Sequence, residues 1–484
     1  MSGQKIQVPD SLSARDKSSF AYKTIKDRLP VIIVKVIDFL HRQRKELHKF
    51  GTTIEKPNET ELAEIEADAK SIIAQLTKVR KELETNKPVE LIERLSLPSE
   101  LEYFNDDVEL WNKSLEANKT DDGTLPRWFD SPWLLVECYL YRKIKEACLR
   151  TKHMQLFDLF AEPKQAACRS SKAQMLIVAN HLIQTKRKIT ESANQTHPSE
   201  RKEFSLFVQL SLWANKSDLS ISNGSVDQAQ AQKLIANIRE SLEELQENIL
   251  CDNMSEIWFK VQSIKSQVKG ATATSKELIY IDLVADNSGY EIFADLCLLH
   301  FLALMLCPIS LQCSGVRFRI HLKRMPWFVS DTLRHDILWL IKMMSTSENE
   351  ALKELAEDWS SFLESNFWEL HDDKFWTMGD DYSTMETLAN DLYRSLQQSS
   401  LIIFKGDLNY RKLVGDRKWH ILTPFEAALR GFAPAPLAAL RTAKADVVVG
   451  IEDINIFSRI NNNELPRDWM ITGDFGLIQF LDPL

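Results

Sequence analysis

The sequence predicts an α/β fold in which a mostly parallel sheet is flanked by helices and preceded by a helical N-terminal domain. Through most of residues 1–270, apolar residues recur at three- and four-residue spacing, the period of amphipathic helices. Beyond that point, short β-branched runs alternate with helical stretches, which is typical of βαβ units and a parallel sheet. We therefore predict a mainly helical region over residues 1–270 and an α/β core over residues 271–484.

Helix starts and apolar spacing identify the helices of the first region. Pro30 opens Val31–Leu40, as a first-turn proline does. Asn58 and Glu61 form a capping pair, and a long apolar series follows them: Leu62, Ile65, Ala69, Ile72, Leu76, Val79 and Leu83. This series spans only about three heptads, which favours an intramolecular hairpin over a coiled coil. Further helices are predicted at Leu134–Leu149, at Met175–Ile183 and from Leu234 to Ile249. Polar loops are predicted at Lys113–Gly123 and Ser192–Glu203.

Four short runs rich in β-branched residues predict the strands of the second region. They are Leu278–Ala285, Val316–His321, Leu401–Phe404 and Val447–Ile451. Ligands of open parallel sheets bind beyond the carboxyl ends of the strands. The residues that follow each run are therefore the first place to look for chemistry.

Composition excludes several classes of function. The 484-residue chain has a formal net charge of -9 and no long basic run, which argues against a nucleic acid or an anionic membrane as its partner. No apolar run approaches the length of a membrane span. The seven cysteines form no C-x-x-C pair, so we expect free thiols in a reducing compartment. The predicted location is the cytoplasm, with the nucleus as a further compartment.

Two acidic clusters follow the first two predicted strands. Asp286-Asn287 comes directly after Leu278–Ala285, and Asp331 follows Val316–His321. The two aspartates are separated by 331 − 286 = 45 residues, enough for one strand–helix–strand crossover, so neighbouring strand ends would bring them together. Three oxygen ligands suit a divalent metal ion that also contacts a phosphate. The alternative is that Asp286-Asn287 forms only a turn and a helix N-cap.

A third polar cluster follows Leu401–Phe404. Lys405, Arg411 and the more distant Lys444 supply cations that a phosphate group needs. Asp407 and Asn409 offer hydrogen-bonding groups suited to sugar hydroxyls. With the two acidic clusters, these residues predict a metal-dependent site that handles phosphate.

These clusters carry a resemblance to a known family. The motifs are Asp286-Asn287-x-Gly289-x-Glu291, Phe328-Val329-Ser330-Asp331, Phe404-Lys405-Gly406-Asp407-Leu408-Asn409-Tyr410-Arg411-Lys412 and Arg441-Thr442-x-Lys444. They resemble the damage-control phosphatases of the domain-of-unknown-function 89 family, subfamily III, the group of acidic residue methyltransferase 1 and sugar phosphate phosphatases. Segments around Phe20, Lys26–Pro30, Glu137 and Trp213–Ser220 also fit, so the resemblance covers nearly the whole chain.

The resemblance implies a metal-dependent phosphatase that acts on sugar phosphates such as fructose 1-phosphate and fructose 6-phosphate. The implied metals are Mn²⁺, Co²⁺ or Ni²⁺, with Mg²⁺ as a further candidate. Asp286, Asn287 and Asp331 would bind the metal, and the two aspartates would be catalytic. The residues implied to line the substrate pocket are Glu291, Asp407, Leu408, Asn409, Tyr410, Arg411 and Lys444. Water activated by the metal is the expected nucleophile, with covalent attack by Asp286 as the alternative.

Some features depart from the family pattern or favour other functions. Leu322 and Ala214 stand where glycine is expected, and Pro308–Gly315 looks like a small insertion. The family implies a second activity, protein-glutamate methylation with S-adenosylmethionine, but the chain has no G-x-G turn for a nucleotide-type site. A third possible class of function is a non-catalytic helical interaction module. Asp474-Phe475-Gly476 matches a kinase motif without the rest of a kinase. The histidines near Asp331, His321 and His335, are expected to be structural.

Overall fold

The computed structural model describes residues 7–50, 56–191, 200–216, 228–270, 278–307 and 315–483. These residues form a seven-stranded sheet in the order β1-β7-β6-β5-β2-β3-β4. The strands are β1 (Ile249–Asp252), β2 (Ile279–Val284), β3 (Val316–His321), β4 (Trp368–His371), β5 (Ser399–Lys405), β6 (Leu437–Thr442) and β7 (Gly476–Leu481). All neighbouring strands are parallel except β6 and β7. The predicted α/β fold with a mostly parallel sheet is confirmed.

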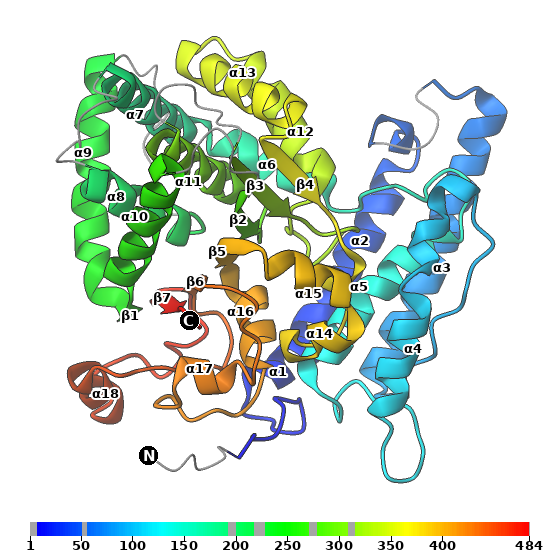
Figure 1. The fold of residues 1–484 in the computed structure, drawn as a ribbon. Helices are drawn as coiled ribbons and strands as arrows, with labels where there is room; N and C mark the ends of the chain where they lie inside the picture. Colours follow the sequence, from blue (N-terminus) through cyan, green and yellow to red (C-terminus); the bar gives the residue numbers. More distant parts are fainter. Residues whose placement is uncertain are drawn as a thin grey trace.

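Helices cover both faces of this sheet (Figure 1). One group packs on the first face: α1 (Phe20–Lys23), α2 (Leu29–Gln43), α3 (Glu59–Glu84), α4 (Val108–Ala117), α5 (Trp133–Leu149), α14 (Met385–Leu388), α15 (Asn390–Leu396), α16 (Gly406–Val414) and α17 (Phe425–Ala428). The other face is covered by α7 (Lys172–Glu191), α8 (Glu200–Leu212), α9 (Gln228–Glu244), α10 (Met254–Gly270), α11 (Tyr290–Leu306), α12 (Arg334–Ser345) and α13 (Glu350–Glu364). Two short helices, α6 (Ala161–Ser170) and α18 (Ile454–Asn461), complete the set within the described residues.

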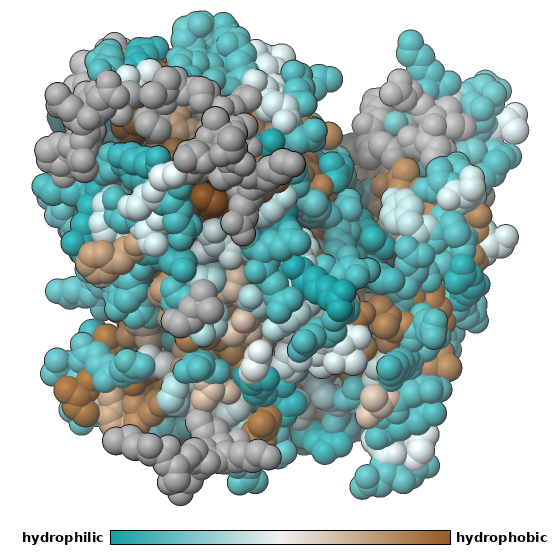
Figure 2. Space-filling view, in the orientation of Figure 1, coloured by the Kyte–Doolittle hydropathy of each residue, from teal (hydrophilic) through white to brown (hydrophobic). Residues whose placement is uncertain are grey.

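The two cores follow from the two-residue period of a strand. Along β5, Leu401 and Ile403 face one core while Ile402 and Phe404 face the other. Helix α11 is buried along its whole length and packs against α7 and α8, because it is apolar on every side. Figure 2 shows a mainly hydrophilic surface on the face it displays. Each helix in the described part of the chain is too short or too polar to cross a membrane.

Most predicted helices are confirmed. The capping pair starts α3, where Asn58 and Glu61 form a complete capping box, and α3 packs on α2 and α5 inside the molecule. Pro30 lies in the first turn of α2. The predicted loop Lys113–Gly123 is wrong in its first half, because α4 continues to Ala117. Residues 192–199 of the second predicted loop lie outside the described residues, and 200–203 begin α8. The helix predicted up to Ile249 ends at Glu244 and gives way to β1.

Three of the four predicted strands are confirmed as β2, β3 and β5. The fourth, Val447–Ile451, is wrong: it is a buried irregular segment. Its backbone bonds to side chains, since Val449 N–H donates to Tyr410 Oη and Val449 O accepts from Gln479. The sequence analysis predicts no strand at the alanine-rich β6, at the short β1 and β4, or at β7. The predicted division near residue 270 stays a prediction, and β1, which precedes it, belongs to the sheet.

Cys307 is disulfide-bonded, so the expectation of free thiols is wrong at this position. Five other cysteines are free: Cys138, Cys148, Cys168, Cys251 and Cys297. Burial raises the pKa of the Cys138 and Cys148 thiols to about 12, which makes both unreactive near neutral pH.

Candidate functional site

The loop from β2 to α11 carries the first acidic cluster. Val284 ends β2, and Asp286 follows two residues later with only 7% of its surface exposed. Gly289 is the N-cap of α11 with φ +76°, a backbone conformation that glycine adopts without strain. Asn287 is thus not the helix cap. Its amide donates instead to Asp286 Oδ2 at 2.8 Å and to Glu291 Oε2 at 2.9 Å.

The loop after β3 lies directly against this one. Because β2 and β3 are parallel neighbours, their carboxyl ends meet at one edge of the sheet. Asn287 and Asp331 form an isolated β-bridge, and Thr332 N–H donates to Asp286 O at 2.8 Å. Phe328 and Val329 hold φ at 43° and 71°, which is strained for side chains of their size. The structure therefore brings Asp286, Asn287 and Asp331 together at one edge of the sheet, as predicted.

The carboxyl groups of Asp286 and Asp331 are both buried in this cluster. Burial raises the pKa of Asp331 to about 6, although the Lys323 ammonium 3.3 Å from its Oδ2 acts in the opposite direction. Burial, with the nearby charges of Glu291 and Asp331, also raises the pKa of Asp286 well above its ordinary value. Apart from this ion pair with Lys323, Asp331 Oδ2 accepts no hydrogen bond from the described residues. Buried carboxylates with an unused oxygen acceptor suit a divalent cation that prefers oxygen ligands.

The start of helix α16 closes over Asp286. Gly406 has φ +82°, and a Cβ at this position would lie 1.8 Å from Asp286 Oδ2. Only glycine leaves room for the carboxylate there. The next residue, Asp407, accepts hydrogen bonds at 2.9 Å from Arg441 Nε and from the backbone N–H of Lys444. Asp407 thereby fixes the segment that brings Lys444 to the site.

The three predicted phosphate-binding cations have different surroundings. Lys405 is buried, with its ammonium 3.2 Å from Asp295 and donating to Ser211 O at 2.5 Å. Arg411 is clamped between Asp416 and Glu137, each at 2.9 Å. Lys444 forms no side-chain hydrogen bond or ion pair with the described residues. Of the three, only Lys444 therefore has a cationic group without a partner among the residues that the structure describes.

Two of the predicted pocket residues support the fold around the site. Asn409 is fully buried and donates to the backbone oxygens of Val284, Ala285 and Lys405. Tyr410 is buried and accepts a hydrogen bond from Val449 N–H. Neither lines the cavity. The remaining predicted residues, Asp286, Asn287, Glu291, Asp331, Asp407, Leu408, Arg411 and Lys444, all do.

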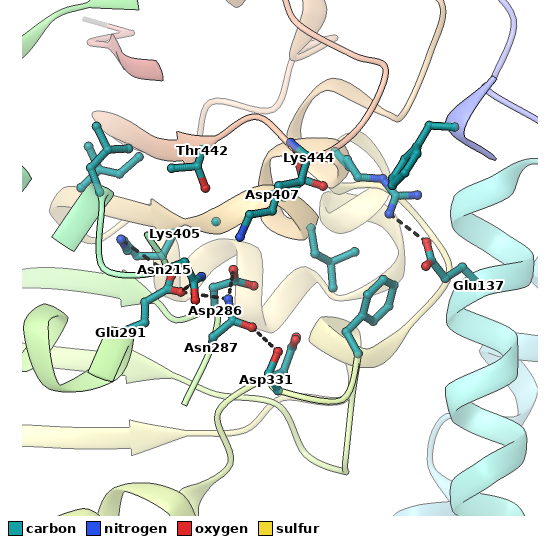
Figure 3. A pocket seen from close by; sticks show the side chains of 18 of the residues that line it. Glu137, Asn215, Asp286, Asn287, Glu291, Asp331, Lys405, Asp407, Thr442 and Lys444 are labelled. Atoms are coloured by element: carbon teal, nitrogen blue, oxygen red, sulfur yellow. Dashed lines mark hydrogen bonds and ion pairs between the residues drawn. The ribbon is translucent and has the colours of Figure 1, made fainter. Parts of the chain in front are cut away.

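The cavity has a volume of about 220 Å³ (Figure 3). Part of its wall consists of residues that the sequence analysis did not assign to the pocket. They are Phe20, Arg28, Trp133, Glu137, Leu212, Asn215 and Thr442. In Figure 3, Glu291 and Glu137 lie at opposite ends of the view, so the cavity extends from the α11 loop towards helix α5. For Phe20, Arg28, Glu137, Asn215 and Thr442, the signal in the sequence was that they lie in motifs of the family resemblance. Trp133 and Leu212 had no such signal.

Within the described residues, a second cluster of side chains could supply ligand atoms to a metal ion. Asp158, His335 and Asp336 have potential ligand atoms within 4.8 Å of one another. However, the Lys164 ammonium lies 2.7 Å from Asp158 and 2.6 Å from Asp336, where it already supplies a positive charge. His335 pairs with Asp158 at 3.1 Å, and His321 with Asp282 at 2.6 Å, so both histidines have hydrogen-bonding partners, as expected.

Comparison with known proteins gives consistent matches along the chain. The family model described as "Damage-control phosphatase ARMT1-like domain" matches residues 24–460. The Homo sapiens protein named "Damage-control phosphatase ARMT1" is 39% identical over 483 residues, which cover 99% of each chain. The Danio rerio protein of the same name is 38% identical and covers 100% of this chain and 99% of its own. A solved duf89 family protein from Pyrococcus horikoshii aligns over 85% of this chain and 97% of its own at 12% identity, with a TM-score of 0.38, too distant to bear on function.

Proposed function

The chain belongs to the damage-control phosphatase ARMT1-like family and is a phosphatase, and we propose that it hydrolyses sugar phosphates with a divalent metal ion held by Asp286, Asn287 and Asp331. Fructose 1-phosphate and fructose 6-phosphate are the proposed substrates. Mn²⁺, Co²⁺ or Ni²⁺ is the proposed metal, with Mg²⁺ as a further candidate. The observation that carries the proposal is the pair of buried carboxyl groups that follow β2 and β3, where Lys323 is the partner of Asp331 Oδ2 among the described residues.

The residues around the proposed metal have distinct tasks. When bound, the ion would neutralise charge on the phosphoryl oxygens and activate a water molecule for attack. Lys444, whose ammonium is not engaged by the described residues, binds phosphate oxygens as a point charge. Asn287 orients Asp286 and Glu291 through its two hydrogen bonds. The Lys323 ammonium, 3.3 Å from Asp331 Oδ2, balances the charge of the Asp331 carboxylate. Asp286 and Asp331 are the proposed catalytic residues.

The size and polarity of the cavity support a small, hydroxyl-rich substrate. Its volume of about 220 Å³ is below the range of roughly 300–1,000 Å³ common for drug-sized ligands. Glu291 and Asp407 provide acceptors, and Leu408 provides an apolar contact at its wall. The five free cysteines, unlike the disulfide-bonded Cys307, support a cytoplasmic location, with the nucleus as a further compartment. We propose no nucleic-acid or membrane partner, consistent with the net charge of -9.

A metal-dependence screen tests this proposal. Protein treated with chelator is assayed for phosphate release from a panel of phosphate esters, with each divalent metal restored in turn. We expect release from the hexose phosphates that disappears on chelation and returns with Mn²⁺, Co²⁺ or Ni²⁺. No release from any ester with any of these metals would reject the proposal. Calorimetry with S-adenosylmethionine covers the methyl-transfer alternative, which no structural observation favours.

A further inference from the structure

The N-terminal helices supply one wall of the cavity, and Arg28 is a cationic residue of that wall with no acidic ion-pair partner among the described residues. We propose that Arg28 is a specificity-determining residue that donates hydrogen bonds to hydroxyl groups of the substrate's carbon chain, at the end away from the phosphate. The proposal rests on the phosphatase function proposed above. It assigns substrate recognition to residues of the helical region, and phosphate and metal binding to the α/β core.

Arg28 is held at the cavity with its donors free. It lines the cavity, is exposed to solvent, and forms no hydrogen bond or ion pair with the described part of the chain. Its guanidinium lies 5.2 Å from the ring centroid of Phe20. Phe20 in turn packs edge-on against Trp133, with ring centroids 5.9 Å apart. The guanidinium is thus supported on one side by an aromatic ring while its five N–H groups stay available.

The backbone around Arg28 is tied to the opposite side of the site. Phe20 N–H donates to the Asp446 carboxylate at 2.5 Å, and Asp446 lies two residues after Lys444. Arg28 is also the last residue of a π-helical turn, Thr24–Arg28, between α1 and α2. π-Helical turns are rare in proteins, and those that occur are frequently found at functional sites. Helical residues that precede β1, the first strand of the sheet, by more than 220 positions are therefore fixed beside the proposed phosphate-binding lysine.

The charges near Arg28 favour uncharged hydroxyl groups as its ligands. Arg411 lies between Glu137 and Asp416, and together with Arg28 these residues make two cations and two carboxylates, so their formal charges cancel. Burial raises the pKa of Glu137, and the charges of Arg411 and Arg28 oppose that rise, which places Arg28 within electrostatic range of Glu137. A second phosphate would add uncompensated negative charge there. A hydroxyl group can accept from Arg28 without that cost.

A matched set of variants tests the role. Arg28→Met removes the guanidinium, and Arg28→Lys keeps the charge without the planar donor set. Lys26→Met is the control: it removes a cation from the same π-helical turn, but Lys26 lies over the Tyr22 ring at 5.5 Å and does not line the cavity. Each variant is assayed with Mn²⁺ on fructose 6-phosphate and on p-nitrophenyl phosphate, which has no sugar hydroxyls. Inhibition by inorganic phosphate is measured alongside.

For Arg28→Met, we expect kcat/KM on fructose 6-phosphate to fall about tenfold, mainly through KM, the loss typical of hydrogen bonds to a charged donor. Arg28→Lys should lose less. Activity on p-nitrophenyl phosphate and inhibition by inorganic phosphate should stay within about twofold. Equal losses on both esters, no loss on either, or the same selective loss in Lys26→Met would overturn the inference while leaving the phosphatase function intact. A wild-type protein inactive on both esters would overturn the proposed function itself.

Discussion

Replacing Gly406 with alanine places a methyl group where the Asp286 carboxylate now lies. The added Cβ would be 1.8 Å from Asp286 Oδ2 and 2.2 Å from its Cγ. Carbon and oxygen atoms that are not bonded stay more than 3 Å apart, so a small adjustment cannot relieve this overlap. The Asp286 side chain has to rotate away, or the start of α16 has to shift. Either change disrupts the proposed metal site at one of its ligands.

The substitution has two separable costs. Alanine at φ +82° carries about 1–2 kcal/mol of backbone strain, whatever its neighbours are. Displacement of Asp286 adds a loss of metal binding. Changing residues that merely orient a metal ligand commonly costs about 10- to 100-fold in affinity or activity. Displacing the ligand itself should reach at least the upper figure. We therefore expect kcat/KM to fall about 100-fold or more in Gly406→Ala.

Gly431→Ala separates the two costs. Gly431 has a similar φ of +89°, but a Cβ there would meet no atom within 4 Å. This control should lose about 1–2 kcal/mol of stability and keep kcat/KM within about twofold of wild type. Stability is measured by denaturant unfolding, and activity by metal-dependent phosphate release. If Gly406→Ala keeps more than a third of the wild-type activity, Asp286 does not hold the position that we assign to it.

Two further predictions concern buried charges. Burial raises the pKa of Asp158, but His335 and Lys164 outweigh it and lower the value from 3.8 to about 2. A lowered folded-state pKa gives stability that is present above about pH 4 and is lost as the pH falls towards 2. Asp158→Asn should thus lower the free energy of unfolding by about 2 kcal/mol at pH 7. The difference from wild type should shrink below pH 4. A difference that does not depend on pH would contradict the lowered pKa of Asp158. Lys405→Met should cost about 3 kcal/mol in denaturant unfolding because it removes the buried cation beside Asp295; unchanged stability would mean that Lys405 is held for substrate instead.

Convergence of the acidic residues could be predicted because it follows from local rules. Each acidic cluster comes after a β-branched run, and parallel neighbours end at the same edge of a sheet. The 45-residue separation of Asp286 and Asp331 is compatible with one crossover, and β2 and β3 are indeed adjacent. The structure therefore agrees with the sequence on where these three side chains lie.

The ion-pair partners of the buried cations, and the cavity wall that comes from the N-terminal helices, could not be predicted from the sequence. Lys405 and Arg411 carry the right charge for phosphate, but Asp295 and Asp416 engage them, and these pairings exist only in the folded chain. Phe20 reaches the site from a segment more than 220 residues before β1, the first strand of the sheet, and no periodicity signals that contact. Val447–Ile451 has strand-like composition, yet it joins no strand of the sheet. Val449 bonds to the side chains of Tyr410 and Gln479, and the N–H groups of Gly450 and Ile451 donate to backbone oxygens of residues 423 and 421.

Locating the metal tests the central claim most directly. Anomalous scattering from crystals of the Mn²⁺-loaded protein, recorded at the manganese edge, shows where the ion binds. Our account predicts one strong peak contacted by Asp286, Asn287 and Asp331, which disappears in Asp331→Asn. A peak between Asp158, His335 and Asp336 instead, or a peak near Asp286 that is unchanged in Asp331→Asn, would contradict it.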